Sequence, residues 1–170
     1  MSFDRWRSLV DGAEVDVGPA IPDSVVSRPD DTDETGDGED AGFFVELKTN
    51  WPGLGAEISN RTSGVTRGYL YDWDEQNETR SLITDIDISD KSSGDVFAFE
   101  DVELDEGEEY LITIDAEGST YDQGFNSDEN NYPYESEDID IVARWRRGSR
   151  DLNSVHAINN IGNPDGVLND

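Results

Sequence analysis

Apolar and polar residues alternate through the middle of the chain with the period of a β-strand. The alternation is clearest at residues 82–88, 110–116 and 139–145, where apolar side chains fall at every second position. Because successive side chains of a strand point to opposite faces of a sheet, each stretch predicts a strand with one dry face. Shorter runs bring the expected total to about eight strands. They lie at residues 43–48, 54–58, 65–71, 96–100 and 119–125.

The connections between these runs are rich in turn residues, and no helical periodicity of useful length intervenes. Antiparallel strands with one wet face, separated by turns about every eight to twelve residues, are typical of two packed sheets. We therefore predict an all-β fold, an antiparallel two-sheet β-sandwich that is jelly-roll-like, with about eight strands at residues 42–147. An N-terminal arm with an acidic linker is expected at residues 1–41, and a C-terminal tail at residues 148–170.

The N-terminal segment carries apolar residues, but too few for a core. Four of them fall at near-helical spacing: Phe3, Trp6, Leu9 and Val10. We interpret these four as an assembly arm that packs on the sandwich or docks into a neighbouring subunit, and a flexible tail is the alternative. The acidic run at residues 30–40 is typical of a linker, because its charges repel one another. The C-terminal tail is the least charged segment, which favours a buried or partner-covered strand.

The charge balance limits the possible partners. The 170 residues include 41 Asp and Glu against 12 Lys and Arg, a net charge of −29. Since proteins bind phosphate through clustered Lys and Arg, this composition excludes nucleic acid and anionic membrane surfaces as partners. Ten of the twelve basic residues are Arg, which together with the acidity indicates adaptation to high salt, where charge repulsion is screened. An acidic disordered chain is the alternative, but four Trp, six Tyr and six Phe oppose it.

The absence of cysteine excludes disulfides, thiolate metal sites and cysteine nucleophiles. No stretch approaches the roughly 18 apolar residues of a membrane-spanning helix, and residues 1–10 lack the apolar run of a secretory signal. We therefore expect a soluble protein without membrane insertion. Two Asn-x-Thr sequences, at Asn60 and Asn77, would matter only in an exported protein.

An enzyme built from this sequence would depend on carboxylates, because the chain has one His and no Cys. Glycoside hydrolysis needs two acids at a set separation, but 41 acidic residues place such pairs on any surface by chance. We therefore predict that the protein is not an enzyme and needs no cofactor, with structural calcium left open. Asp128, Asn130 and Glu135 offer oxygen ligands for calcium in an acidic loop, and a hydrated loop is the alternative.

Aromatic residues in polar loops are the most suggestive group in the sequence. Three such rings lie in or beside expected loops and have polar neighbours close in sequence: Trp73, Tyr132 and Tyr134, with Asp74, Gln76 and Asn131. Flat rings beside amides and carboxylates are a usual means of stacking on sugar rings and binding their hydroxyls. We take these six residues as candidate glycan contacts. The alternative is that the rings cap the ends of the core or fill a subunit interface.

Four stretches together resemble a known type of module: residues 64–72, 81–88, 94–99 and 104–118. The third is a Gly-Asp-x-Phe-x-Phe sequence that starts at Gly94, and the fourth has Gly107 three residues before Tyr110. The order of these strands is similar to that of jelly-roll modules in tail-fibre and spike proteins of tailed viruses and in secreted carbohydrate-binding proteins. No ligand residue of such modules can be matched onto this chain, so the resemblance concerns the fold.

With the salt-adapted composition, the resemblance implies a virion structural protein of a haloarchaeal tailed virus. Such a protein would be made in the host cytoplasm and displayed in the virion as part of a tail fibre, baseplate or capsid spike. Its expected partners are other virion proteins, further copies of itself in a homo-oligomer, and host-surface glycan or S-layer. Two alternatives are a secreted or cell-surface carbohydrate-binding module and a small carboxylate-based glycoside hydrolase.

The net charge of −29 leads to a prediction about folding. We expect the isolated protein to fold only at high salt, because carboxylate repulsion dominates in dilute buffer and is screened at about 2 M KCl. Thermal melts followed by circular dichroism at about 0.1 M and about 2 M KCl test this expectation. Equal melting temperatures in the two buffers would contradict it.

Overall fold

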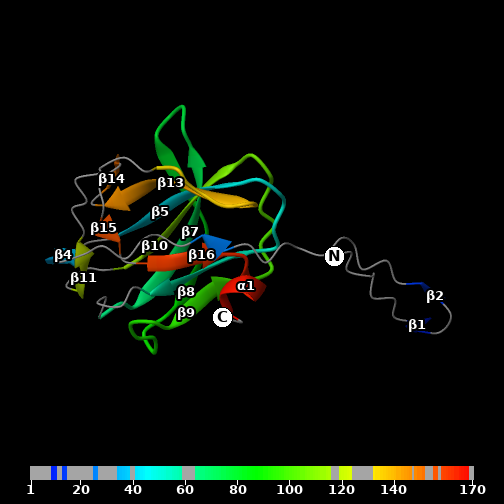
Figure 1. Ribbon diagram of the computed structural model, residues 1–170, viewed down its shortest axis with the longest axis horizontal. Helices are drawn as coiled ribbons and strands as arrows, with labels where there is room; N and C mark the ends of the chain where they lie inside the picture. The colour runs from blue at the N-terminus through cyan, green and yellow to red at the C-terminus, as the bar shows by residue number, and fades with distance from the viewer. Residues whose placement is uncertain are drawn as a thin grey trace.

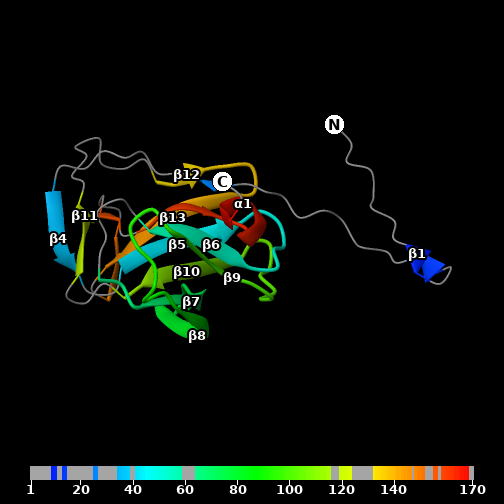
Figure 2. The same ribbon diagram turned by 90° about the horizontal axis from the view of Figure 1, so that it is seen from below.

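The computed structural model describes the backbone in eleven segments, which are residues 9–10, 13–14, 25–26, 34–38, 41–58, 64–115, 119–123, 132–146, 148–151, 155–156 and 158–168. Over these residues the protein is almost entirely β-structure, with one short helix. The prediction of an all-β, antiparallel two-sheet sandwich is confirmed. Figures 1 and 2 show the two sheets packed face to face, with the helix beside the smaller one.

The larger sheet contains seven strands, and every pairing in it is antiparallel. In spatial order they are β12 (Tyr134–Glu135), β13 (Ile139–Arg146), β5 (Ala41–Leu47), β10 (Glu109–Ile114), β7 (Arg67–Asp74) and β8 (Thr79–Asp87), and β14 (Ser149–Asp151) also pairs with β13. Strands β5, β10 and β13 are neighbours in space but distant in sequence. The chain therefore passes repeatedly between the sheets, as it does in Greek-key sandwiches.

The smaller sheet has the order β3 (Val25–Val26), β16 (Ile158–Gly162), β6 (Leu54–Ile58) and β9 (Val96–Phe99). Helix α1 (Pro164–Leu168) contacts β6, β9 and β16. A three-stranded sheet joins β15 (Val155–His156), β11 (Ser119–Gln123) and β4 (Glu34–Gly38), and β1 (Leu9–Val10) pairs with β2 (Ala13–Glu14). In both views β4 and β11 lie at the end of the sandwich opposite to α1.

The main core fills the space between the two sheets. It includes fully buried side chains from the larger sheet, such as Phe43 and Ile112, and from the smaller sheet, such as Leu54 and Ile58. Burying a side chain of this size stabilises the fold by about 1.5–3 kcal/mol relative to leaving it exposed. Trp51 is 2% exposed and belongs to the same cluster, so this loop ring caps the core.

The expectation of one dry face per strand is wrong for the three strands with the clearest alternation. Strand β10 is buried on both faces, because Leu111 and Thr113 are fully buried along with their neighbours. In β13 a bulge after Ile141 turns the next residues to the opposite face. In β8, which ends the described part of its sheet, a bulge beside Leu82 leaves that side chain 54% exposed. Hydrophobic alternation cannot reveal an inserted residue of this kind.

Strand pairings cross the predicted boundaries between arm, sandwich and tail. Strand β16, from the expected tail, lies inside the smaller sheet, and its Ile158 and Ile161 are fully buried. Of the two alternatives for the tail, a buried or a partner-covered strand, β16 is the first. Strands β3 and β4, from the expected arm and linker, pair with β16 and β11, because strand pairing needs only backbone groups and tolerates acidic side chains.

The four proposed arm residues are only partly within the described structure. Leu9 and Val10 form β1 and pair with Glu14 and Ala13, so their backbone is extended rather than helical. Phe3 and Trp6 lie outside the described residues.

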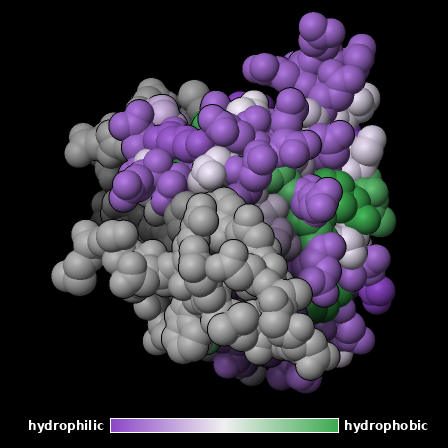
Figure 3. All heavy atoms as spheres, turned by 90° about the vertical axis from the view of Figure 1, so that its right-hand side faces the viewer, coloured by the Kyte–Doolittle hydropathy of each residue, from purple (hydrophilic) through white to green (hydrophobic). Residues whose placement is uncertain are grey.

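The described surface is mainly hydrophilic, as expected for an acidic chain. In the coloured part of Figure 3 most residues are hydrophilic, and the hydrophobic ones gather in a patch at one side. The large apolar side chains that are exposed among the described residues are Leu82, Ile83 and Leu168. No helix in the described part of the chain is long and apolar enough to cross a membrane.

The position of β16 leads to a prediction about stability. Replacing Ile158 by Ala should lower the free energy of unfolding by about 2–5 kcal/mol, because a fully buried side chain leaves a cavity at the centre of the smaller sheet. Chemical denaturation at high KCl measures the loss. Leu168→Ala, at a site 45% exposed, is the control and should change stability by less than about 0.5 kcal/mol. Wild-type stability of Ile158→Ala would show that the C-terminal strand is not part of the folded unit.

Candidate functional site

A second apolar cluster covers the face of the larger sheet that points away from the smaller sheet, here called the outer face. Its buried members come from β5, β7, β10 and β13: Phe44, Trp73, Leu111, Ala143 and Trp145. Tyr71 and Val142 are partly buried and pack against it. Since an antiparallel sheet commonly leaves its second face polar and solvated, this apolar face needs an explanation.

The bulge in β13 is what brings Trp145 to this cluster. Ile139 and Ile141 face the main core, but the extra residue Val142 reverses the alternation, so Ala143 and Trp145 point to the outer face. Without the bulge, every second residue of β13 would continue to face the main core. The bulge therefore supplies one of the two tryptophans of the outer face.

Three rings of the cluster meet edge to face. The centroid of Phe44 lies 4.8 Å from that of Trp73 and 5.9 Å from that of Trp145, with interplanar angles of 68° and 73°. The two tryptophan centroids are 5.9 Å apart at an angle of 68°. Such pairs contribute about 0.5–1.5 kcal/mol each beyond their buried area. The two indoles are therefore held at a fixed angle to each other.

Two arginines cover the edges of this aromatic cluster. The guanidinium carbon of Arg80 lies 4.5 Å from the ring centroid of Tyr71 and 4.7 Å from that of Trp145. Arg150 lies 4.6 Å from the centroid of Phe44 and binds both carboxylate oxygens of Glu109, one of them at 3.1 Å. Burial raises the pKa of Glu109, and the hydrogen bond and charge of Arg150 offset part of that rise. The pair is therefore a partly desolvated anchor rather than a solvent-exposed ion pair.

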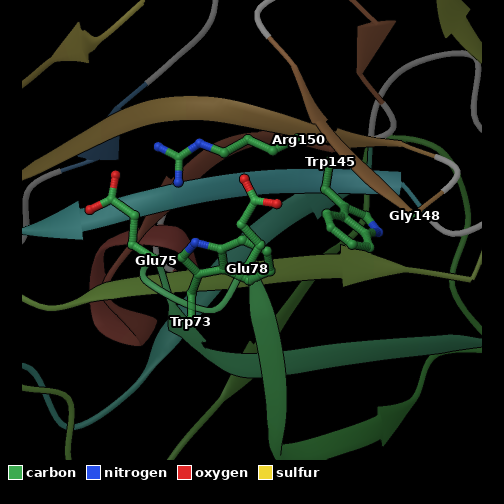
Figure 4. Close-up of a pocket in the computed structure, with 6 residues that line it drawn as sticks. All are labelled: Trp73, Glu75, Glu78, Trp145, Gly148 and Arg150. Atoms are coloured by element: carbon green, nitrogen blue, oxygen red, sulfur yellow. The ribbon is translucent and has the colours of Figure 1, made fainter.

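A pocket of about 330 Å³ opens beside the two indoles. Its lining residues are Trp73, Glu75, Glu78, Trp145, Gly148 and Arg150. Figure 4 shows the two carboxylates and the guanidinium around the edge of Trp73 that carries the ring nitrogen. Trp73 is 8% exposed, and its Nε1 is a buried donor that has no acceptor within the described part of the chain. Leaving a buried donor unpaired costs about 1–3 kcal/mol, so the pocket wall contains a polar group that a ligand could satisfy.

The carboxylates of the pocket are presented by the turn between β7 and β8. Asp74, the last residue of β7, accepts hydrogen bonds from the backbone N–H of Asn77 at 3.1 Å and from its Nδ2 at 2.7 Å. These bonds lower the pKa of the Asp74 carboxyl, the side-chain bond more than the backbone bond. Glu75 and Glu78 are exposed, and Glu78 has a positive φ of 51°. The turn thus holds two exposed carboxylates at the mouth of the pocket.

The structure separates the six predicted glycan contacts. Trp73 lines the pocket, while Asp74 is engaged in the turn and Gln76 is exposed in the same turn. Tyr132 and Tyr134 pack edge to face at 4.9 Å against the main core, beside and within β12. Strand β12 lies four strands away from β7 in the larger sheet, roughly 19 Å at the usual spacing. These tyrosines and Trp73 therefore do not form one surface within a chain, and Asn131 lies outside the described residues.

The remaining pocket residues were not identified from the sequence. Glu75 and Glu78 lie within two residues of Gln76, which was a candidate glycan contact. The polar turn was therefore the signal that could have pointed to these two glutamates. Trp145 and Arg150 follow a bulge that has no recognisable sequence pattern. Phe43 and Phe44 are consecutive in the sequence, and two consecutive apolar residues do indicate a strand buried on both faces.

The proposed calcium ligands fall largely outside the described structure. Asp128 and Asn130 lie outside it, and Glu135 is an exposed residue of β12. Among the residues that the structure describes, no group of three or more His, Asp or Glu side chains is arranged to hold a metal ion. The calcium site stays a prediction.

Comparisons with known proteins give no match to a family model, to a curated protein or to a solved structure. The function must therefore be inferred from the chain's own geometry.

The ion pair of the outer face leads to a prediction about protonation. In Arg150→Gln the pKa of Glu109 should rise further, because burial remains while the hydrogen bond and positive charge are lost. A raised pKa favours the protonated form, so this carboxyl's contribution to stability is present below the ordinary Glu pKa and lost as the pH rises through the raised value. In Arg150→Gln this loss of stability should therefore extend to higher pH than in the wild type. Carboxyl-carbon NMR titration measures both proteins.

The control is Arg67→Gln, which removes the partner of Asp85 on the edge strand β8. It should leave the Glu109 titration unchanged. A lower pKa of Glu109 in Arg150→Gln would contradict the proposed balance between burial and charge.

Proposed function

We propose that the protein is a non-enzymatic virion structural protein whose sandwich binds a carbohydrate of the host surface through the outer-face pocket. The observation that carries the binding proposal is the pocket itself, with two indoles at a fixed angle and three charged side chains at its edge. Sugars combine apolar ring faces with hydroxyl groups, and aromatic walls with polar rims match both. The virion assignment draws its support from the sequence resemblance and the composition.

The carboxylates of the pocket favour binding over catalysis. In glycosidases one carboxyl group acts as a general acid and is kept protonated near neutral pH by burial or by a neighbouring charge. Glu75 and Glu78 are both exposed, in a tight turn at the mouth of the pocket. The half-buried carboxyl group nearby, Glu109, is bound at both oxygens by Arg150 and so is engaged as an anchor.

The net charge of −29 supports this mode of host contact. At high salt the Debye length falls to about 3 Å, so a contact that depends on long-range attraction is weak. Ring packing and short hydrogen bonds persist under those conditions. A pocket of aromatic walls is therefore well suited to attachment in strong salt, and assembly with other virion proteins or as a homo-oligomer would multiply its affinity.

The test is to block the pocket without removing any of its contacts. Gly148 lines the pocket, has a φ of 76°, and has open space where a Cβ would be. Asn tolerates this backbone conformation better than most residues, so Gly148→Asn should fold and place a side chain at the pocket. We expect binding of the full-length protein to purified host envelopes, in about 2 M KCl, to weaken at least about tenfold.

The matched control is Gly107→Asn. Gly107 has a φ of 80° and open space around it, but it lies in the turn before β10, outside the pocket lining. It should bind envelopes like the wild type. Equal binding by wild type and Gly148→Asn would remove the pocket from host contact. Mass spectrometry of purified virions tests the location, and absence of the protein from them would favour the carbohydrate-binding module over the virion component.

A further inference from the structure

We propose that the outer-face pocket selects uncharged, hydroxyl-bearing sugars and rejects acidic ones. The inference rests on the proposed carbohydrate-binding function and concerns which sugars the same pocket accepts. It follows from two features that line the same space: an N–H donor without an acceptor among the described residues, and a pair of exposed carboxylates.

The donor in the wall requires an acceptor from the ligand. Nε1 of Trp73 has no hydrogen-bond partner among the residues that the structure describes, although Trp73 is only 8% exposed. Figure 4 places this nitrogen on the side of the ring that faces Glu75 and Glu78. The nitrogen itself has almost no exposed surface, so the exposed side chain of Glu75 or Glu78 must move before a ligand oxygen reaches it. A quaternary ammonium ion offers no acceptor, so it would leave the indole N–H unpaired.

The carboxylates at the mouth require donors from the ligand. Ionised Glu75 and Glu78 accept hydrogen bonds and cannot donate them. A sugar hydroxyl serves as donor to a carboxylate and as acceptor from the indole, so one neutral ring can satisfy both sides. A sugar carboxylate or sulfate would instead meet two negative charges at contact distance.

The arginine of the pocket does not offset this repulsion. Arg150 donates to both oxygens of Glu109 and stacks on Phe44. Glu109 takes up two of the five N–H donors of Arg150 and already balances its charge, so a ligand anion gains less from this guanidinium than from an unpaired one. The repulsion acts at contact, where salt weakens it less than it weakens interactions between charges farther apart than the Debye length, which is about 3 Å at about 1 M. The selectivity therefore belongs to the pocket and not to the overall charge of the chain.

The experiment compares matched sugars that differ in a single group. The probes are the methyl glycosides of glucose and glucuronic acid and of galactose and galacturonic acid, which exchange a hydroxymethyl group for a carboxylate. Tetramethylammonium chloride, which has no hydroxyl group, is the cationic probe. Binding to the full-length protein is measured by NMR titration in about 2 M KCl. The wild type should bind the neutral member of at least one pair about tenfold or more tightly than its acidic partner.

Two variants separate the contributions of the indole N–H and of the two carboxylates to sugar binding. Trp73→Phe keeps a ring but removes the N–H, and should weaken neutral-sugar binding about five- to tenfold. The double variant Glu75→Gln/Glu78→Gln keeps the side-chain shapes and should reduce the preference for neutral sugar to about twofold, mainly by tightening acidic-sugar binding. Its control is Glu103→Gln/Glu106→Gln, which changes the net charge equally at exposed carboxylates outside the pocket and should keep the wild-type preference.

The outcomes distinguish the selectivity from the proposed function. If Gly148→Asn abolishes sugar binding but both members of each pair bind equally, only the selectivity is overturned. The same holds if the preference survives in Glu75→Gln/Glu78→Gln, if tetramethylammonium binds more tightly than the neutral sugars, or if envelopes bind through the pocket while neither neutral glycoside does. If neither sugars nor envelopes respond to Gly148→Asn, the proposed function itself fails.

Discussion

The burial of β5 and β10 on both faces is the constraint on which the rest of the structure depends. Their inward side chains form the main core with the smaller sheet, and their outward side chains, Phe44 and Leu111, are also fully buried. A strand buried on both sides must have cover on both sides, and the smaller sheet provides only one. Side chains from neighbouring strands provide the other, namely Trp73 from β7 and Trp145 from β13. The outer-face pocket lies against this cover, so the candidate site is a consequence of how the centre of the larger sheet is packed.

Much of this fold can be predicted from patterns in the sequence. The site depends on strand pairing and packing, which those patterns do not reveal. The strand at Leu54–Ile58 was predicted with its observed bounds, because turn residues flank a short apolar run. The alternation in β13 was read as one face, but the extra residue Val142 divides it between two faces and turns Trp145 outward. A bulge depends on pairing with a partner strand, which a single stretch of sequence does not contain. Tyr132 packs on the core, which was the alternative to glycan contact, and loop position alone does not decide between the two.

The preference for arginine over lysine has a structural role in addition to any adaptation to salt. Arg80 lies over two rings, and Arg150 lies over Phe44 while binding both carboxylate oxygens of Glu109. A planar guanidinium can stack on a ring and form a two-pronged bond to a carboxylate, whereas an ammonium group is a compact and strongly hydrated charge. Replacing these arginines by lysine would keep the charge of the outer face and lose its geometry. In a chain with only 12 basic residues, some are therefore used to close an apolar surface rather than to neutralise acids.

High salt acts differently on the parts of the outer face. Exposed pairs such as Arg67–Asp85 are screened and contribute little, while the partly buried Glu109–Arg150 pair is screened much less. Apolar packing is not screened at all, and the contact of the two indoles is of that kind. The pocket therefore keeps its walls and its anchor under conditions that weaken surface electrostatics, while Glu75 and Glu78 remain solvated at its mouth. An acidic chain of this kind is suited to high salt, where attraction between distant charges is lost. A binding site of this composition still works there, because it recognises a ligand by shape and short hydrogen bonds.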